Sequence, residues 1–267
     1  MSRIAETFAR LKREKRRGFI PFIMAGDPDL NATYHLLIEM ARKAGADLIE
    51  LGVPFSDPVA DGPVIQRASE RALKNDFGIA EIFRVVAHAR AQVEAPVVLF
   101  SYFNPLMQYG IERLSVEAAD SGIDGVLVTD LVPEEAEQIA PALKAHDLDM
   151  IFLVAPTSSD ARLRMVAEHA TGFIYTVARA GVTGAREKVS EESEKLVARV
   201  RGFSDLPVAV GFGISSAEQV AEVWRYADAA VVGSAIVAEI EKLAGTAKFI
   251  ERIGAFAHNL LPPRSCN

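Results

Sequence analysis

One acidic residue stands inside an apolar segment and could carry protons. Glu50 follows Leu48 and Ile49 and precedes Leu51, so a strand over these residues would bury its carboxyl group. Burial disfavours the charged form and raises the pKa of a carboxylic acid toward neutrality, where it can give and take protons. A structural glutamate held in a salt bridge would leave the same pattern, and the residue alone does not separate the two interpretations.

A second carboxylate follows in the segment after Glu50. Residues 52–63 are rich in Gly, Pro, Ser and Asp, which predicts a long irregular loop. Such a loop can bring Asp57 or Asp61 back over the end of the strand, so that one ligand meets two carboxylates. Because an Asp-Pro pair such as Asp57-Pro58 is typical of turns, we favour Asp61.

Three glycine-rich turns could bind phosphate. They span residues 181–184, 211–213 and 233–234, each at the end of a predicted strand. Glycine lets backbone N–H groups approach phosphate oxygens, and the N-terminus of a following helix adds a favourable dipole. Glycine is also ordinary in tight turns, but three such turns at consecutive strand ends favour a phosphate site.

The sequence does not place the residues needed for two known mechanisms of carbon–carbon bond chemistry. A Schiff-base aldolase needs a lysine at a strand end, and a metal-dependent aldolase needs clustered ligands, usually histidine. Every lysine and histidine of the sequence falls in a predicted helix or loop. Such chemistry would therefore depend on carboxylates alone, which requires a substrate whose own ring can take up electrons.

Short apolar segments alternate with amphipathic ones along the chain, the pattern of buried parallel strands covered by helices. Asp47, Asp124 and Asp228 stand in similar turns just before three of the strands. Eight strands are expected, at residues 19–24, 48–51, 97–100, 125–128, 150–154, 173–176, 208–210 and 229–232. Helices are expected at residues 2–15, 33–43, 79–92, 134–145, 161–169, 191–201, 217–225 and 247–260. This order predicts an α/β fold, a (β/α)8 TIM barrel with an extra N-terminal helix.

Length and composition fit one such barrel over residues 1–267, since the fold typically needs about 250 residues. A doubly wound open sheet is the alternative, because strand number alone does not show closure. A net charge of −7 argues against nucleic-acid binding, and the short basic cluster at residues 10–17 fits a solvated helix end. The single cysteine, Cys266, the lack of a signal sequence and the lack of a long apolar run indicate a cytoplasmic protein away from membranes.

Three segments resemble the signature sequences of the tryptophan synthase alpha-subunit family. They are PFIMAGDP at 21–28, ELGVPFSDPVADGPVIQ at 50–66 and ARAGVTG at 178–184. The similarity runs essentially from end to end of the chain. It implies a lyase that cleaves indole-3-glycerol phosphate into indole and glyceraldehyde 3-phosphate by a retro-aldol reaction, for tryptophan biosynthesis.

The resemblance also implies roles for individual residues. Glu50 matches the family's general acid/base, Asp61 the carboxylate that binds the indole N–H and stabilises the positive indolenine, and Tyr175 a supporting residue. By the same matching, four residues would bind the phosphate: Gly184, Gly213, Gly233 and Ser234. Four would line the indole pocket, although by type alone each fits a plain core: Phe22, Phe100, Leu127 and Phe212. Arg179 and Thr183 would belong to a mobile loop, where Ala178 replaces an expected small polar residue.

The family works with a beta subunit in an alpha2beta2 heterotetramer. That partner carries pyridoxal phosphate and receives indole through a tunnel, so no cofactor and no metal are expected on this chain. Asn104-Pro105 and residues 54–60 would form the interface.

Two other functions are weighed against this one. A phosphosugar isomerase or epimerase would share the glycine turns but would not explain an apolar pocket beside Glu50. A regulatory subunit that only binds the phosphate ligand would not need a desolvated acid.

Overall fold

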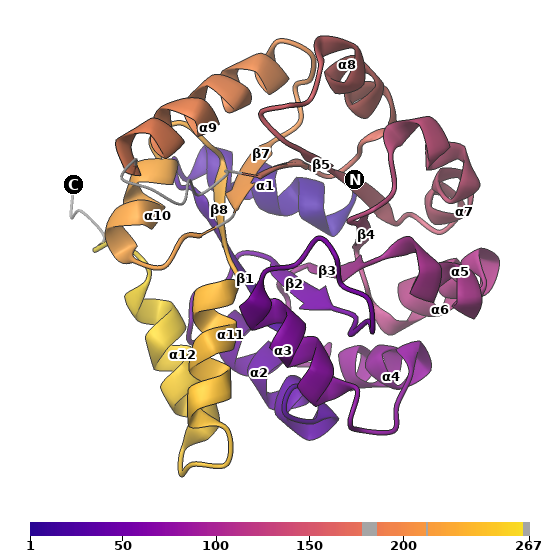
Figure 1. The fold of residues 1–267 in the computed structure, drawn as a ribbon, viewed down its shortest axis with the longest axis vertical. Coiled ribbons are helices and arrows are strands. Elements are labelled where there is room, and N and C mark those ends of the chain that lie inside the picture. The colour runs from indigo at the N-terminus through magenta and orange to yellow at the C-terminus, as the bar shows by residue number, and fades with distance from the viewer. Residues whose placement is uncertain (178–185, 212, 264–267) are drawn as a thin grey trace.

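The structure, a computed structural model, describes residues 1–177, 186–211 and 213–263. Within those residues, eight parallel strands follow one another round a barrel, which is closed because β8 pairs with β1. The colour gradient of Figure 1 runs once round this barrel. The strands are β1 Gly18–Met24, β2 Ile49–Gly52, β3 Val97–Ser101, β4 Gly125–Val128, β5 Asp149–Val154, β6 Ile174–Val177, β7 Val208–Gly211 and β8 Ala229–Val232. Closure confirms the TIM barrel, and the open doubly wound sheet is wrong.

Each strand begins and ends within one residue of the range expected from the sequence. Their side chains alternate between two apolar layers, because successive residues of a strand point to opposite faces. Ile49 and Leu51 contribute to the layer between the sheet and the helices, whereas Leu48 and Val98 contribute to the layer inside the barrel. The continuous apolar runs of the sequence arise from burial on both faces.

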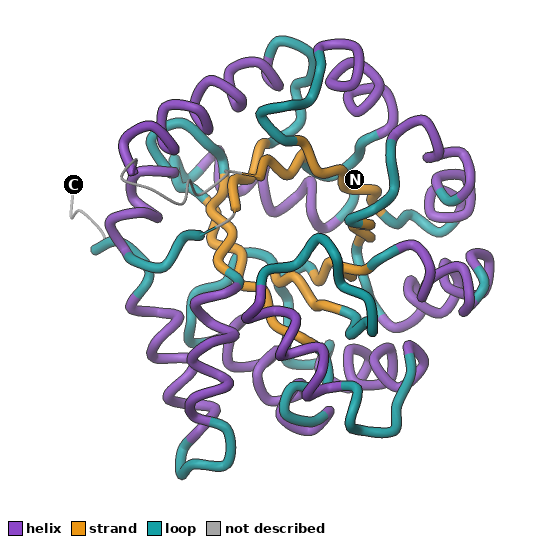
Figure 2. Tube along the Cα trace, in the orientation of Figure 1, coloured by secondary structure: helices purple, strands orange, loops and turns teal. Residues whose placement is uncertain are grey.

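Helices surround the strands on the outside, as Figure 2 shows. Those expected from the sequence are α2 Leu30–Arg42, α4 Ile79–Ala89, α8 Asp160–His169, α9 Arg186–Arg201, α10 Ala217–Val223 and α12 Phe249–Asn259. Four further helices were not predicted from the sequence pattern: α3 Pro63–Ala72, α5 Phe103–Tyr109, α6 Ile111–Ser121 and α11 Ser234–Leu243.

The single helix expected over residues 134–145 is wrong. A 3₁₀ helix, η1 Pro133–Gln138, is followed by a short α-helix, α7 Ala140–Ala145. Pro141 stands in the first turn of α7. Because proline lacks an N–H group and its ring clashes with the carbonyl four residues earlier, it breaks or kinks a helix that runs through its position.

The expected N-terminal helix is α1 Arg3–Arg13, and it closes the end of the barrel at which the strands begin. Its buried residues Ile4, Phe8 and Leu11 contact the apolar layer inside the barrel. Arg3 forms an ion pair with Asp124, at the start of β4, with its Nε atom 2.5 Å from Oδ1. The opposite end, where the strands finish, is left for the loops that carry the candidate site.

Three of the six basic residues at positions 10–17 form ion pairs with aspartates of the chain. Arg10 and Arg16 lie near Asp47, and Arg17 lies near Asp228, at N–O distances of 3.9, 3.3 and 3.0 Å. These pairings fit the solvated helix end expected from the sequence. Over the described ranges, no helix combines the length and the apolar character that crossing a membrane requires.

Candidate active site

Glu50 lies inside the barrel, on β2. Its neighbours Ile49 and Leu51 face the outer helices, so strand alternation turns the Glu50 side chain inward. The residue is 1% exposed, and among the described residues its Oε1 atom has no hydrogen-bond partner and no cation forms an ion pair with it. Burial raises the pKa of Glu50 to about 8. At pH 7 the side chain is therefore mainly a neutral carboxylic acid, rather than half of a salt bridge.

Tyr175 shares the barrel interior with Glu50. It stands on β6 and belongs to the inner apolar layer together with Leu127 of β4. Burial and, to a smaller extent, the charge that Glu50 can carry raise the pKa of Tyr175 above its usual value. Tyr175 therefore remains protonated as a phenol.

The loop between β2 and α3 brings Asp61 to the same end of the barrel. Asp61 is half-buried one residue before Gly62, the N-cap of α3. Gln66 donates to the Asp61 carbonyl (3.0 Å), and the Ala60 N–H donates to the Tyr102 hydroxyl (2.9 Å). Burial raises the pKa of Asp61 to about 6, although the nearby Tyr102 hydroxyl opposes this shift. Asp61 is therefore mainly a carboxylate at pH 7.

Asp57 has a different environment. It is exposed, accepts a hydrogen bond from Ser56, and its carbonyl accepts the Val59 N–H in a turn. These contacts fit the turn role that led us to favour Asp61.

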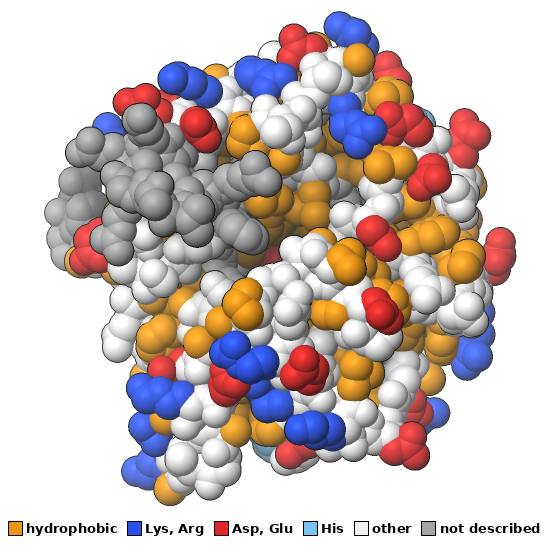
Figure 3. All heavy atoms as spheres, in the orientation of Figure 1, with side chains coloured by type: hydrophobic (Ala, Val, Ile, Leu, Met, Phe, Trp, Pro, Cys, Tyr) orange, Lys and Arg blue, Asp and Glu red, His pale blue; other side chains and the backbone are white. Residues whose placement is uncertain are grey.

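Two aromatic rings stand on the strands that flank β2. Phe22 of β1 pairs in register with Glu50, and its ring meets that of Phe100 edge-on, with 5.3 Å between centroids. Phe100 in turn pairs in register with Leu127 on β4. Figure 3 shows that this face of the molecule is hollowed near its centre and that hydrophobic side chains gather on the walls of the hollow. The arrangement offers an apolar wall beside the buried acid.

The expected phosphate turns that the structure describes lie at neighbouring strand ends. Gly213 follows β7 with a φ of +74°, a conformation that glycine adopts without strain. Gly233 follows β8 as the N-cap of α11, whose first residue is Ser234. Four residues expected in the site lie outside the described residues, namely Arg179, Thr183, Gly184 and Phe212, as does Ala178.

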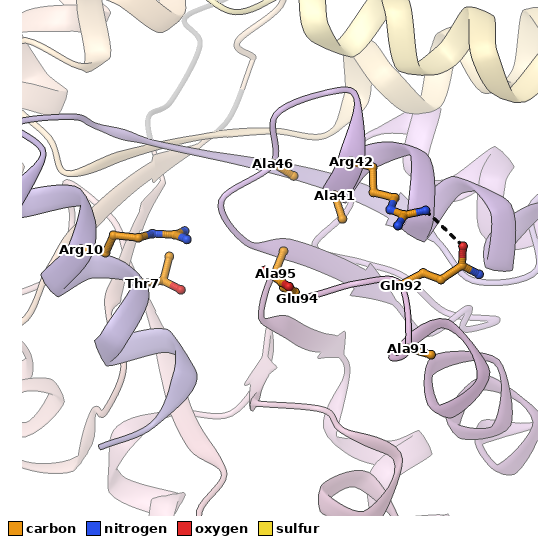
Figure 4. A pocket seen from close by; sticks show the side chains of 9 residues that line it. All are labelled: Thr7, Arg10, Ala41, Arg42, Ala46, Ala91, Gln92, Glu94 and Ala95. Atoms are coloured by element: carbon orange, nitrogen blue, oxygen red, sulfur yellow. Dashed lines mark hydrogen bonds between the residues drawn. The ribbon is translucent and has the colours of Figure 1, made fainter.

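Another pocket, of about 390 Å³, lies at the opposite end of the barrel. Figure 4 shows its lining, in which Arg42 donates to Gln92 (3.3 Å). None of the site residues expected from the sequence lines it. In barrels of this fold the loops after the strands form the active site, which leaves this pocket outside the candidate site.

Tyr102 adjoins the candidate site and was not predicted from the sequence. It directly follows Ser101, the last residue of β3, and is 3% exposed. The sequence signal that points to it is this place at a strand end, close to Phe100, which is expected in the indole pocket.

A family model described as "Tryptophan synthase alpha chain" matches residues 8–261. The chain belongs to the tryptophan synthase alpha chain family. This confirms the resemblance drawn from the three sequence segments.

Individual relatives and structures agree with this family. Tryptophan synthase alpha chains from Geobacter sp. strain M21 and Solibacter usitatus are each 48% identical to this chain over 260 residues, covering 97% of both sequences. The crystal structure of tryptophan synthase subunit alpha from Legionella pneumophila str. Paris matches with a TM-score of 0.89 and 36% identity, covering 97% of both chains. A Mycobacterium tuberculosis tryptophan synthase structure matches with a TM-score of 0.87 and 36% identity, covering 97% of this chain and 96% of that one.

Proposed function

We propose that this chain cleaves indole-3-glycerol phosphate into indole and glyceraldehyde 3-phosphate. The observation that carries the proposal is Glu50, a buried acid without a hydrogen-bond partner for Oε1 among the described residues, on the strand between those of Phe22 and Phe100. Burying a carboxyl group without a hydrogen-bond partner costs free energy of folding, and groups with such a perturbed pKa cluster at functional sites. The aromatic pair supports a flat apolar ring as the part of the substrate beside it.

The reaction needs one proton delivered and one removed. Glu50, protonated near neutrality, gives its proton to the indole ring carbon that bears the glycerol chain. The ring nitrogen becomes positive, and the Asp61 carboxylate binds its N–H and stabilises that charge. The Glu50 carboxylate then takes the proton of the adjacent glycerol hydroxyl. The carbon–carbon bond breaks, its electron pair returns to the ring, and indole and an aldehyde are released.

The two carboxyl groups need opposite charge states, and their environments favour them. The pKa of Glu50 is raised to about 8 and that of Asp61 to about 6. Between these values Glu50 is an acid while Asp61 is an anion. Tyr175 supports Glu50 from the opposite side of the barrel interior.

The phosphate of the substrate would bind at the N-terminus of α11. Gly233 and Ser234 present backbone N–H groups there, and Gly213 offers a second turn on the neighbouring strand. A helix N-terminus with free N–H groups favours a dianion. The family resemblance assigns Gly184 to the phosphate site, Arg179 and Thr183 to a mobile loop, and Phe212 to the indole pocket.

We infer a mechanism through carboxylates, without a metal or a Schiff base. The described lysines lie on helices or in turns rather than on strands. Among the described residues, no three His, Cys, Asp or Glu side chains are placed to hold one metal ion. Pyridoxal phosphate would belong only to the partner.

An alpha chain of this family has a beta subunit as its partner. We infer an alpha2beta2 heterotetramer in the cytoplasm, with residues 54–60 and Asn104-Pro105 at the interface. Val59 is 85% exposed on the first segment, and Met107 is 51% exposed on α5 beside the second. An exposed apolar side chain on the first segment and another next to the second support a protein contact there.

The test is indole release from indole-3-glycerol phosphate by the purified chain, alone and with a beta subunit. We expect indole in both assays and more in the second. Absence of indole in both would refute the proposed function, and isomerised phosphosugar would instead favour the isomerase alternative.

A further inference from the structure

Tyr102 connects β3 to the loop that carries Asp61. It is the N-cap of α5, and its ring lies 5.2 Å from that of Phe55, measured between centroids. Phe55 belongs to the same loop as Asp61, and its N–H donates to the Ser69 hydroxyl of α3 (3.4 Å). The Tyr102 ring is therefore held against the loop, and its hydroxyl has a fixed place.

That hydroxyl already has a donor. The N–H of Ala60 donates to the Tyr102 oxygen (2.9 Å), which uses one of its lone pairs and leaves its own proton free to donate. The next residue along the loop is Asp61, close enough that this hydroxyl lowers the pKa of its carboxyl group. A phenol held in this way offers the carboxylate a directed donor.

The backbone of the loop has a separate anchor. Gln66 donates to the carbonyl groups of Pro58 (3.4 Å) and Asp61 (3.0 Å) and touches no carboxylate oxygen in doing so. The loop would remain attached through Gln66 if the Tyr102 hydroxyl were removed. The position of the loop backbone therefore depends on Gln66, whereas the orientation of the Asp61 side chain depends on Tyr102.

We propose that Tyr102 is a positioning residue for Asp61, which aims the Asp61 carboxylate at the indole N–H through the phenolic proton. The inference rests on the proposed function, and it adds a residue that acts through Asp61 rather than on substrate.

The charges around the pair support this role. Burial first, and then the charge of Asp61, raises the pKa of Tyr102, so the phenol keeps its proton throughout the working range. Asp130 also faces Tyr102, and its Oδ1 atom accepts the Phe103 N–H (2.7 Å). Among the described groups, Tyr102 is the one that lowers the pKa of Asp61. Removing the hydroxyl should therefore raise that pKa above about 6.

The test compares Tyr102→Phe with two matched variants of the full chain. Tyr109→Phe removes the other tyrosine hydroxyl of α5, which bonds Glu117 away from the site. Gln66→Met removes the backbone anchor and keeps the phenol. In each protein the pKa of Asp61 is measured by carbon NMR of labelled aspartate, and kcat/KM for indole-3-glycerol phosphate is measured from pH 5 to 9.

We expect Tyr102→Phe to raise the pKa of Asp61 by about one pH unit, which lowers kcat/KM about fivefold at pH 6 and nearly tenfold at pH 5. Tyr109→Phe should match the wild type. Gln66→Met should raise KM and leave the acidic limb of the kcat/KM pH profile in place. An unshifted pKa in Tyr102→Phe, or an equal shift in Gln66→Met, would overturn the proposal. If the wild type releases no indole, the proposed function fails, while the NMR titration still decides whether Tyr102 controls Asp61.

Discussion

Tyr175 fills the space in which a side chain at position 211 would lie. A Cβ atom placed on Gly211 would stand 2.6 Å from Tyr175 Cζ and would overlap the hydroxyl. Tyr175 pairs in register with Ala209 on β7, and its ring leans over the glycine two residues further on. Glycine at position 211 thus leaves room for the Tyr175 ring inside the barrel. This reason for a glycine is separate from phosphate binding.

Gly211→Ala should therefore destabilise the fold. Overfilling a tightly filled core costs about 1–3 kcal/mol, and we expect that loss in the free energy of unfolding by urea. Tyr175→Leu should relieve the overlap, so the double variant should lose less than the sum of the two single variants. Additive losses would show that the two positions do not compete for space.

A valine at position 213 should weaken phosphate binding. Gly213 and Gly245 both have positive φ angles, +74° and +76°, so valine strains the backbone similarly at each. Only Gly213 lies at the candidate site. We expect Gly213→Val to raise the Kd for glycerol 3-phosphate at least about tenfold, or about 1.4 kcal/mol, measured by calorimetry. Gly245→Val, the control, should keep the wild-type Kd, and equal effects of both would remove Gly213 from the phosphate site.

The wild-type pH profile of kcat/KM should be bell-shaped. Asp61 must be charged and Glu50 must be protonated, and their pKa values are raised to about 6 and about 8. Activity should fall below the first value and above the second. Steady-state indole assays from pH 5 to 9 give the profile. A flat profile over that range would contradict the charge states assigned to the two residues.

Stability should respond to pH through Glu50. Its folded-state pKa, about 8, lies above its ordinary value of 4.5, so the folded state holds the proton more tightly than the unfolded chain. Unfolding between these values releases a proton, and stability falls as pH rises, by up to about 1.4 kcal/mol per pH unit. Glu50→Gln lacks this loss. In urea unfolding, the free energy of unfolding of the variant should rise relative to that of the wild type as the pH increases from 5 to 8. A constant difference between the two free energies would contradict the assigned burial.

The strands could be predicted because each is marked by a short apolar run and by turn residues next to it in the sequence. Eight buried runs gave boundaries within one residue, and the repeated turn residues Asp47, Asp124 and Asp228 have one shared role. Each accepts the N–H of a residue at the start of a neighbouring strand, respectively Phe19, Val97 and Val208. Such short-range patterns can be read directly from the sequence.

Other features depend on contacts that the sequence does not display. Closure of the barrel requires β8 to meet β1, and Pro141 divides a segment whose periodicity alone favours one helix. Glu50 could be selected from its apolar neighbours, but the missing partner of Oε1 appears only in the fold. Tyr102 escaped selection because its role depends on a loop more than forty residues earlier.

The central claim is that Glu50 carries the proton, and Glu50→Gln tests it most directly. The amide keeps the size of the side chain but cannot exchange a proton in the reaction. We expect the purified variant, assayed with the beta subunit, to bind glycerol 3-phosphate with wild-type affinity and to release indole from indole-3-glycerol phosphate at least about a thousandfold more slowly. Normal indole release by a correctly folded variant would contradict the account.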